Sequence, residues 1–285
     1  MTILVTGATG NLGALAVEHL LQRVPASELA VSVRDPGKAA GLAERGVDVR
    51  HGDFDEPDTL REAFAGVDKL LLVSTSGPDE LRVGQHANAV RAAKEAGIRF
   101  IAYTSVTDAD TSPVGLAVVH KATEEGIRES GIPFAFLRNG MYHENYTPQL
   151  SGAYERGALM TATGDGRIAS VSREDLALAA AVVMTGDGYE NTVHELTGPR
   201  AWNFDELAAI ATEVTGKPLS HKSVPGPELV AALTGAGLPG FLAELFVNID
   251  ENIQDGVFTE VRPDLDRLIG RPATTIEDAV RAAFA

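Results

Sequence analysis

Short apolar runs alternate with longer segments of helical periodicity along the first half of the chain. Six runs are predicted strands, at 3–6, 29–34, 47–53, 69–75, 100–105 and 134–138, and several are almost uninterruptedly apolar, as is typical of strands covered on both faces. Helices are predicted between them at 11–23, 37–45, 57–65, 79–96 and 115–130, several ending at a glycine: Gly46, Gly66, Gly97 and Gly131. This order predicts an α/β fold with a doubly wound parallel sheet.

The alternation weakens after about residue 140. We predict helices at 143–157, from Ser172 as N-cap to Met184, at 203–215 and at 227–234, and strands at 167–171, 193–196 and 219–224. The last strands and helices suggest one further βαβ-like layer. We therefore expect a dinucleotide-binding domain at 1–140 and a smaller α/β substrate lobe at 141–285, with the chain free to cross back between the two.

Composition narrows the class of protein. The chain has 24 Lys and Arg against 40 Asp and Glu, a net charge of −16, which disfavours nucleic acid and anionic membranes as partners. It has no cysteine, and the most apolar later run, 176–184, is too short to span a bilayer. We predict no signal peptide, because Met1 leads directly into the first strand without a basic and apolar leader. We expect a cytoplasmic protein that acts on a small molecule; a homodimer stays open.

The first candidate site is a glycine turn. Gly7, Gly10 and Gly13 follow the first apolar run and open the first helix, with one residue more in the first gap than the G-x-G-x-x-G pattern. Glycines at these places allow a tight turn and close backbone approach, and the helix N-terminus faces a pyrophosphate. The pattern predicts nucleotide binding; the alternative is a tight strand-to-helix turn without a ligand.

Two residues at strand ends bear on which nucleotide binds. Arg34 ends the second strand, where an arginine offers its planar guanidinium to a 2′-phosphate, so NADP(H) is favoured over NAD(H). The neighbouring Asp35 could weaken that preference, and Arg34 could also be an ordinary surface arginine. Asp53 ends the third strand, where it could meet the adenine or cap the next loop.

Five stretches carry a family resemblance: TGATGNLG, VRDPGKA, RHGDFDEPDTL, YTS and LRNGMYHENY. They resemble the NmrA-like branch of the atypical short-chain dehydrogenases/reductases, and within it the bacterial NADPH:quinone oxidoreductases, with triphenylmethane reductases as near relatives. The resemblance implies NADPH as cofactor. It implies cofactor contacts from the glycine turn (Gly7, Ala8, Thr9, Gly10, Asn11 and Leu12), from Arg34, and from Ser74, Thr75 and Ser76. It also implies that Arg138, Asn139, Gly140, Met141, Tyr142 and His143 lie by the nicotinamide and the substrate cleft. To the cofactor-binding set we add Gly13 and Asp53 from their positions at the turn and the strand end.

The usual proton donor of short-chain dehydrogenases is absent. These enzymes place a tyrosine four residues before a lysine, but Ala117 stands four residues before Lys121, and Ser105 alone cannot supply a proton. A quinone that accepts hydride becomes a delocalised phenolate, which water can protonate, whereas an isolated ketone becomes a basic alkoxide that needs an acid. The sequence therefore favours hydride transfer from NADPH to a quinone or similar flat conjugated acceptor.

His120, Lys121 and Tyr142 are candidates for a role in catalysis. His120 and Glu124 lie one helical turn apart, so the carboxylate could orient the imidazole toward the cleft, and Lys121 is beside them. The alternative is a packing pair, with Lys121 and Glu125 as an ordinary ion pair. Tyr142 could stack against a flat acceptor. The seven histidines show no metal-ligand spacing, so we expect no metal, and we interpret His86 as a surface or capping residue.

Other functions remain open at this point. A non-catalytic, redox-sensing regulator that binds NADP(H) needs no proton donor, so the missing tyrosine suits it as well. A reductase of bulky conjugated dyes would differ from a quinone reductase mainly in the shape of its cleft.

Overall fold

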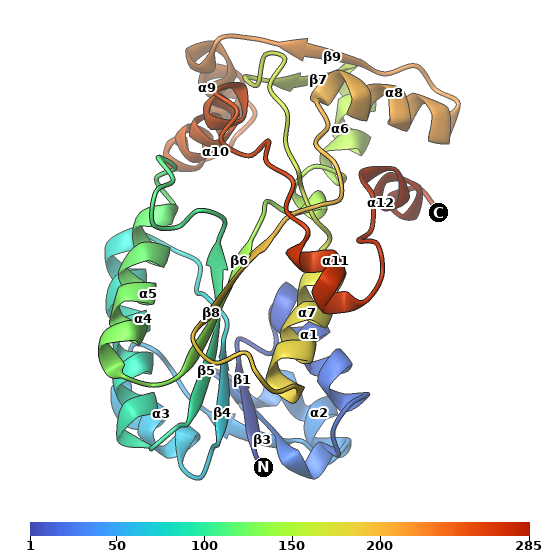
Figure 1. Cartoon of the computed structure of the whole chain (residues 1–285). Helices are drawn as coiled ribbons and strands as arrows, with labels where there is room; N and C mark the ends of the chain where they lie inside the picture. The colour runs from blue at the N-terminus through green and yellow to red at the C-terminus, as the bar shows by residue number, and fades with distance from the viewer.

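A seven-stranded parallel sheet forms the centre of the computed structural model, which describes residues 1–285 (Figure 1). The strand order is β3-β2-β1-β4-β5-β6-β8. The strands are β1 (Ile3–Thr6), β2 (Leu29–Val33), β3 (Asp48–His51), β4 (Lys69–Leu72), β5 (Phe100–Val106), β6 (Phe134–Asn139) and β8 (Thr192–Leu196). The strand order reverses direction between β1 and β4, which is where doubly wound sheets bind ligands. The predicted fold class is confirmed.

Helices cover both faces of this sheet (Figure 1). One face carries α1 (Asn11–Leu21), α2 (Ala40–Glu44), α7 (Arg173–Thr185) and α11 (Asp264–Ile269), and the other carries α3 (Pro57–Phe64), α4 (Asp79–Glu95) and α5 (Ala117–Ser130). Short 3-10 helices lie at Ala26–Glu28, Pro36–Ala39 and His143–Asn145. A separate apolar core fills each side, because the strand residues alternate between the two faces.

The first-half predictions are confirmed in type and order. All six strands form, each within a few residues of its predicted bounds, and each predicted helix is present. The four glycines proposed as helix ends all have positive φ, between 71° and 88°, a conformation that costs glycine little.

The second half departs from the predictions in two places. The sequence predicts that the run at 193–196 belongs to the C-terminal lobe, but as β8 it pairs with β6 and completes the main sheet. Likewise α7 returns to pack against α1. The predicted strand at 167–171 forms only isolated bridges, from Ile168 to Trp202 and from Val171 to Tyr142. This segment connects the lobe to the sheet, so its backbone bonds go to single partners on several elements. Residues 173–196 therefore belong spatially with the first layer.

The remaining elements form a smaller lobe at one end of the sheet, drawn above it in Figure 1. A two-stranded parallel sheet of β7 (Ala158–Thr161) and β9 (Ser220–Ser223) is surrounded by α6 (Gln149–Arg156), α8 (Phe204–Thr215), α9 (Gly226–Gly235), α10 (Gly240–Gln254) and α12 (Ile276–Ala283). Tyr146, Trp202 and Phe204 form the aromatic centre of its core, with ring centroids 5.3 to 5.5 Å apart. The sequence did not predict β7, α10, α11 or α12.

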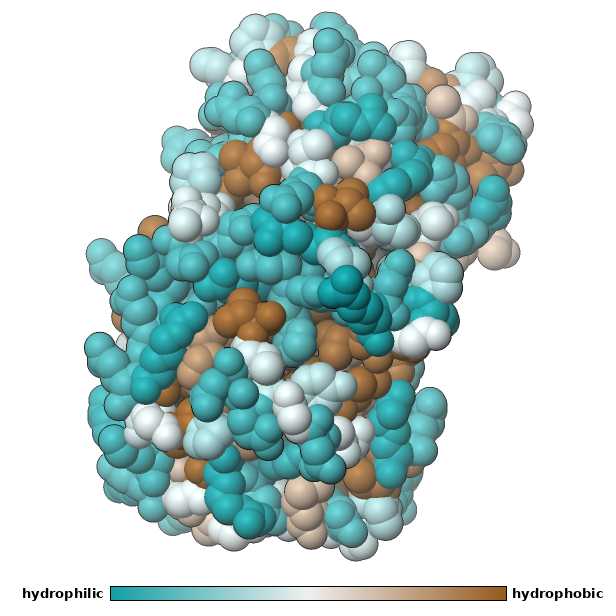
Figure 2. All heavy atoms as spheres, viewed as in Figure 1, coloured by the Kyte–Doolittle hydropathy of each residue, from teal (hydrophilic) through white to brown (hydrophobic).

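Side-chain caps explain where several helices begin. Ser172 accepts a hydrogen bond from the N–H of Asp175 at the start of α7, as its N-cap assignment predicted, and Asn203 does the same for α8. The face of the molecule in Figure 2 is mainly hydrophilic, with hydrophobic residues gathered in small patches. No helix has the length and apolar character needed to cross a membrane.

Candidate active site

The glycine turn after β1 is shaped by close backbone approach. Gly7 has a φ of 62°, and its carbonyl accepts the N–H of Gly10 at 2.9 Å. A Cβ on Gly13 would lie 2.2 Å from the carbonyl oxygen of Gly7, so any side chain there would push α1 away from the turn. Because Gly13 has no Cβ, α1 can pack directly against the turn that follows β1. Gly7 adopts the left-handed conformation that this turn requires.

The N-terminus of α1 is suited to an anion. Gly10 is its N-cap and offers no side-chain hydrogen bond, and the first turn holds no acidic residue. The first N–H groups of a helix have no partner within it, and the helix dipole places partial positive charge there. A phosphate group fits this end of the helix.

A cleft of about 600 Å³ opens in front of this helix end, at the point where the strand order reverses. We call it the switch-point cleft. It is lined by Gly7, Thr9, Gly10, Asn11, Leu12, Gly13, Ser32, Val33, Arg34, Asp35, Lys38, Gly52, Asp53, Phe54, Val73, Ser74, Thr75, Ser76, Gln85, Tyr142 and Arg173. Most of the residues predicted to contact the cofactor are therefore brought together, although Ala8 is buried behind the turn.

Arg34 and Lys38 place positive charge at the β2 end of the cleft. The side chain of Asp35 accepts the N–H of Gly37 at 3.0 Å, so it caps the following turn. Asp53 also lines the cleft while its carboxylate accepts the N–H of Asp55 at 3.0 Å, so both functions considered for it are compatible.

Two polar atoms in the cleft are buried without a hydrogen-bond partner: the hydroxyl oxygen of Ser32 and the amide oxygen of Gln85. Buried polar atoms usually have partners, so these two fit a polar ligand such as the ribose and base of a dinucleotide. Gly52 lets the Ser32 hydroxyl approach, since a Cβ there would lie 2.1 Å from it. The residues present thus fit NADP(H).

His86 anchors the 74–76 segment through hydrogen bonds to Thr75. Its Nε2 accepts the N–H of Thr75 at 3.0 Å and lies 3.1 Å from the Thr75 hydroxyl. Its Nδ1 lies 2.8 Å from the Thr123 hydroxyl, which itself donates to the carbonyl of Val119. Thr123 must therefore accept from Nδ1–H, and this leaves Nε2 as the acceptor. Burial and the nearby Arg82 lower the pKa of His86 to about 4, so the ring is neutral at physiological pH.

The interpretation of His86 as a surface or capping residue is wrong, because its side chain is buried between α4 and α5. No local signal marks the residue. It lies mid-helix, eleven positions beyond Thr75, and only the packing of α4 beside the end of β4 brings them together.

Tyr142 lines the switch-point cleft together with Arg173. The guanidinium of Arg173 lies 4.7 Å from the centre of its ring, a cation–π geometry, and also donates to the side-chain oxygen of Asn145 at 3.0 Å. Burial raises the pKa of Tyr142, so its hydroxyl stays protonated. Arg173 was not predicted for the site. It comes from the start of α7, which crosses back from the second half of the chain.

Arg138 lies apart from the cleft. Its guanidinium bonds the two oxygens of Glu124 at 2.9 and 2.8 Å, and also bonds Glu195 and Asp110, each at 2.9 Å. Burial opposes its charge, but the hydrogen bonds to Glu124 and Glu195 raise its pKa. Arg138 therefore ties β6 to α5 and β8, and four of its five N–H donors are used in these bonds.

The rest of the predicted 139–143 stretch is divided among several environments. Asn139 is buried with its side-chain oxygen unpartnered, and Gly140 packs against the carbonyl of Leu196. His143 is buried and bonds the Ser170 hydroxyl at 2.7 Å. None of the three lines the cleft.

The two helix residues proposed for catalysis lie away from the cleft. His120 is buried, with its Nδ1 2.9 Å from the Tyr103 hydroxyl, and burial together with Arg82 and His86 lowers its pKa to about 3. The expected pairing of His120 with Glu124 does not form, because Glu124 bonds Arg138 and Ser105. Lys121 is exposed on α5 and lines no pocket described here.

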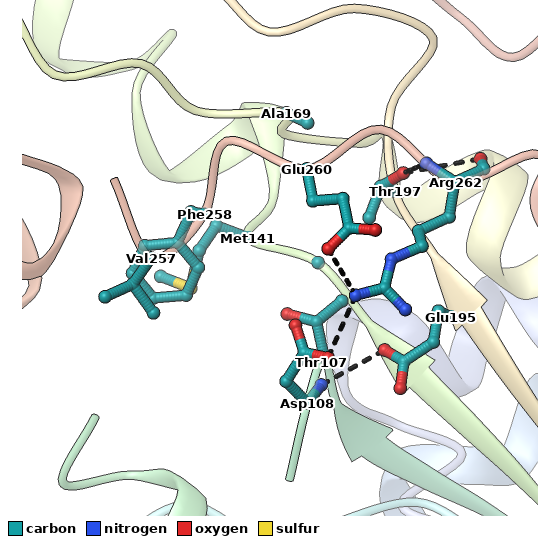
Figure 3. A pocket seen from close by; sticks show the side chains of 11 residues that line it. Thr107, Asp108, Met141, Ala169, Glu195, Thr197, Val257, Phe258, Glu260 and Arg262 are labelled. Atoms are coloured by element: carbon teal, nitrogen blue, oxygen red, sulfur yellow. Dashed lines mark hydrogen bonds and ion pairs between the residues drawn. The ribbon is translucent and has the colours of Figure 1, made fainter. Parts of the chain in front are cut away.

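A polar seam joins the end of the sheet to the chain that follows α10 (Figure 3). Arg262 bonds Asp108 at 3.0 Å and Glu260 at 2.6 Å, and Glu195 accepts the N–H of Asp108 at 3.1 Å. The cavity among these residues is about 10 Å³, room for one water. The seam fastens the chain across the ends of β5, β6 and β8. No three His, Asp or Glu side chains converge to hold a metal ion.

A second, larger cavity of about 860 Å³ lies in the lobe, and we call it the apolar pocket. Nine of the nineteen lining residues come from α6, α9 and α10, and eleven of the nineteen are hydrophobic. They are Met141, Asn145, Tyr146, Pro148, Gln149, Gly152, Arg156, Met160, Thr161, Phe204, Leu229, Ala232, Leu233, Ala236, Gly237, Leu238, Phe246, Ile249 and Asp250. Met141 lines this pocket and Tyr142 lines the switch-point cleft, so consecutive residues belong to the walls of the two spaces.

The parallel sheet, the uncapped helix end and the switch-point cleft define a dinucleotide-binding protein of the doubly wound class. Comparison with known proteins makes this more specific. The model of the NmrA-like family matches residues 1–278, and the chain belongs to this family.

Similar proteins support the assignment. Quinone oxidoreductase 2 of Escherichia coli (strain K12) is 43% identical over 282 residues, which cover 99% of this chain and 98% of that protein. The structure of triphenylmethane reductase from Citrobacter sp., complexed with NADP(H), is 44% identical with a TM-score of 0.96 and covers 99% of this chain and 100% of its own. The structure of E. coli QOR2, an NADPH-dependent quinone oxidoreductase complexed with NADPH, is 43% identical with a TM-score of 0.97 over 100% of both chains.

Proposed function

We propose that this protein is an NADPH-dependent reductase that passes a hydride to a quinone or a similar flat conjugated acceptor. The observation that carries the proposal is that consecutive residues, Met141 and Tyr142, line two different spaces. One space has the helix end and cations that suit NADP(H), and the other is large and apolar. An acceptor in the apolar pocket can reach the nicotinamide end of the switch-point cleft, as hydride transfer requires.

The chain's residues divide the work of holding the cofactor. The backbone of the glycine turn and the first turn of α1 would bind the pyrophosphate, Arg34 and Lys38 the 2′-phosphate, and His86 would keep Thr75 in place beside it. Bound NADPH would supply the hydride from its nicotinamide ring. The similar structures of triphenylmethane reductase and QOR2, each complexed with this cofactor, support the same choice for this chain.

The proposed set of site residues follows the geometry. It keeps Tyr142 and leaves out Arg138 and His120, whose side chains form buried hydrogen bonds, and Lys121, whose side chain is exposed.

The available side chains favour an acceptor that needs no strong acid. Ala117 is buried at the position of the missing tyrosine, and His120 is neutral inside the helix layer. Burial keeps the Tyr142 hydroxyl protonated but raises its pKa, which makes it a weak proton donor and a good hydrogen-bond donor. A conjugated ring spreads the negative charge that follows hydride addition, so hydrogen bonding and water suffice.

An oxidation assay tests the proposal. We expect purified protein to accelerate NADPH oxidation with simple benzoquinones or naphthoquinones, and to do so less well with NADH. Binding of NADP(H) without turnover of any quinone or conjugated dye would contradict the proposed reaction and favour the redox-sensing regulator. Size-exclusion chromatography of the same protein would test the homodimer, which stays a prediction. The division of the chain into two parts at residue 140 also stays a prediction.

A further inference from the structure

His221 of β9 has a hydrogen-bond partner at each ring nitrogen. Its Nδ1 lies 3.1 Å from a carboxylate oxygen of Asp205, in the first turn of α8, and its Nε2 lies 2.7 Å from the hydroxyl oxygen of Thr161, at the end of β7. A carboxylate can only accept, so Nδ1 carries the hydrogen, and in the neutral ring Nε2 accepts from the Thr161 hydroxyl. One line of hydrogen bonds therefore joins a hydroxyl, an imidazole and a carboxylate from three elements.

Thr163 fixes the Thr161 hydroxyl from the other side. The two hydroxyl oxygens are 2.8 Å apart, and the N–H of Thr163 also donates to the Thr161 oxygen at 3.3 Å. Because the hydrogen of Thr161 is directed at His221, the Thr163 hydroxyl is the donor in this pair. The Thr161 oxygen is thus held in one place.

This line of hydrogen bonds runs from the apolar pocket to the surface. Thr161 lines the pocket, and so does Phe204, whose ring centre lies 5.8 Å from that of the His221 ring. The His221 side chain is only 3% exposed, so a positive charge on it needs a partner close by, and the Asp205 carboxylate, 64% exposed, is that partner. His221 can therefore hold a second proton behind the pocket wall.

Reduction of a quinone needs a proton as well as a hydride. The hydride brings two electrons and one hydrogen, which turn a neutral quinone into a hydroquinone monoanion and leave the nicotinamide oxidised. One proton must then reach the anionic oxygen. Ala117 stands where the usual donor would be, so a donor elsewhere in the acceptor's surroundings would stabilise this charge as it forms.

We propose that Thr161, backed by His221 and Asp205, is the proton donor for an acceptor in the apolar pocket. The inference rests on the proposed function and deepens it. The Thr161 hydroxyl gives its proton to the anionic oxygen of the acceptor and takes one from Nε2 of the His221 imidazolium. The neutral ring keeps its Nδ1–H on Asp205. After the product leaves, water in the pocket returns a proton to Nε2 by the same route.

Other charges lie near this line and bear on its pH dependence. Lys222 follows His221 on β9 and is exposed. In the pocket wall, Arg156 is exposed, and Asp250 accepts the N–H of Ala162 at 2.8 Å. Burial raises the pKa of Asp250 to about 6, which brings its titration close to the range in which histidines change charge. The difference between wild-type and variant pH profiles is therefore the measurement that reports His221.

The first test compares Thr161→Val, Thr161→Ser and a control, Thr185→Val. Valine keeps the shape of the side chain and removes the hydroxyl, whereas serine keeps the hydroxyl. The Thr185 hydroxyl bonds the carbonyl of Ala181, and the residue lines neither the cleft nor the pocket. The rate measured is the single-turnover oxidation of NADPH by 2-methyl-1,4-naphthoquinone, which product release does not limit.

We expect Thr161→Val to lower this rate about ten- to a hundredfold, because water replaces a positioned donor only in part. Thr161→Ser and Thr185→Val should stay close to the wild-type rate. The affinity for NADPH, measured by fluorescence titration, should be the same in all four proteins.

A pH profile tests the role of His221 behind Thr161. Only the imidazolium can pass a proton to Thr161, so the wild-type rate should fall as the pH rises from about 6 to about 9. His221→Gln should be slow at the acidic end and lack this fall. Asp205→Asn should move the fall to lower pH, because it removes the carboxylate that stabilises the imidazolium. His19→Gln is the control, since His19 pairs with Glu174 at 2.9 Å but lines neither cavity.

Two outcomes would overturn the inference: a wild-type rate in Thr161→Val, or a wild-type pH profile in His221→Gln. Either would leave the three side chains with a structural role in joining β7, β9 and α8. If Thr161→Val fails to bind NADPH, the profiles of His221→Gln and of the exposed Asp205→Asn decide. If the wild-type protein oxidises NADPH with no quinone, the proposed function itself fails, whereas turnover that none of these variants changes rejects the proton donor alone.

Discussion

The switch-point cleft and the apolar pocket have the consecutive residues Tyr142 and Met141 in their walls, yet the chain builds them in different ways. Backbone shapes the cleft: a left-handed glycine, a helix placed within contact of a strand end, and free N–H groups. Side chains from three helices of the lobe shape the pocket. Backbone geometry suits the constant phosphates of a cofactor, whereas a wall of apolar side chains can change its shape and charge to suit a different acceptor. The two regions should therefore respond separately to mutation.

The largest effect is expected in the backbone of the cleft. In Gly13→Val the new Cβ would meet the Gly7 carbonyl, so α1 must move and the pyrophosphate site must open. We expect KM for NADPH to rise by two orders of magnitude or more, or binding to be lost, as measured by fluorescence titration. Gly41→Ala is the matched control, because nothing lies within 4 Å of its Cβ. Wild-type affinity in Gly13→Val would contradict the assignment.

A smaller effect within the same cleft concerns the choice of nucleotide. Arg34→Ala should raise KM for NADPH by roughly ten- to a hundredfold, which corresponds to about 1.5–3 kcal/mol for a hydrogen bond to a charged group. KM for NADH should change little, because NADH lacks the 2′-phosphate. Arg91→Ala on the exposed side of α4 is the control. An equal loss for both nucleotides would remove the argument for NADPH.

Filling the apolar pocket should raise KM for the acceptor and leave KM for NADPH unchanged. Leu233→Trp adds a large ring to the wall of the apolar pocket, and we expect KM for a naphthoquinone to rise about tenfold while KM for NADPH stays constant. Leu245→Trp, at a side chain that is 40% exposed and outside the pocket, should alter neither value. A parallel rise of both constants in Leu233→Trp would show that the two spaces are not independent.

The smallest change in KM is expected at His86, which does not line the switch-point cleft. His86→Gln should raise KM for NADPH about threefold, since glutamine holds Thr75 less rigidly than the imidazole does. kcat should hardly change, because His86 touches neither substrate directly.

His86 also predicts a pH dependence of stability. The folded protein binds this proton only near pH 4, whereas the unfolded chain binds it near 6.5, so unfolding takes up a proton between these values. The free energy of unfolding should therefore fall as the pH falls from about 6.5 to 4, with a contribution from His86 on the order of 3 kcal/mol. Urea unfolding measures it. His86→Gln should flatten this slope, and His51→Gln, at an exposed position, should not.

The first half of the fold and most of the cleft could be predicted from the sequence because the signals are local. Each strand leads directly into a turn and a helix, so Gly13 and Arg34 are already placed by the elements that precede them. His86 and Arg173 could not be found in this way. His86 reaches Thr75 only through helix packing, and Arg173 reaches Tyr142 only because α7 returns to the first layer.

The sequence by itself therefore determined the parallel sheet, the phosphate turn and the absence of a tyrosine before Lys121. It also indicated the NmrA-like family, which the comparison shows. Only the tertiary structure decided that β8 completes the sheet, that Arg138 and His120 are buried away from the cleft, and that α6, α9 and α10 enclose an apolar pocket containing Asp250. The physical reason is the sequence separation between the residues on which each feature depends. Turns and caps depend on residues a few positions apart, whereas burial and charge pairing depend on contacts across a hundred residues or more, such as the ion pair between Arg262 and Asp108.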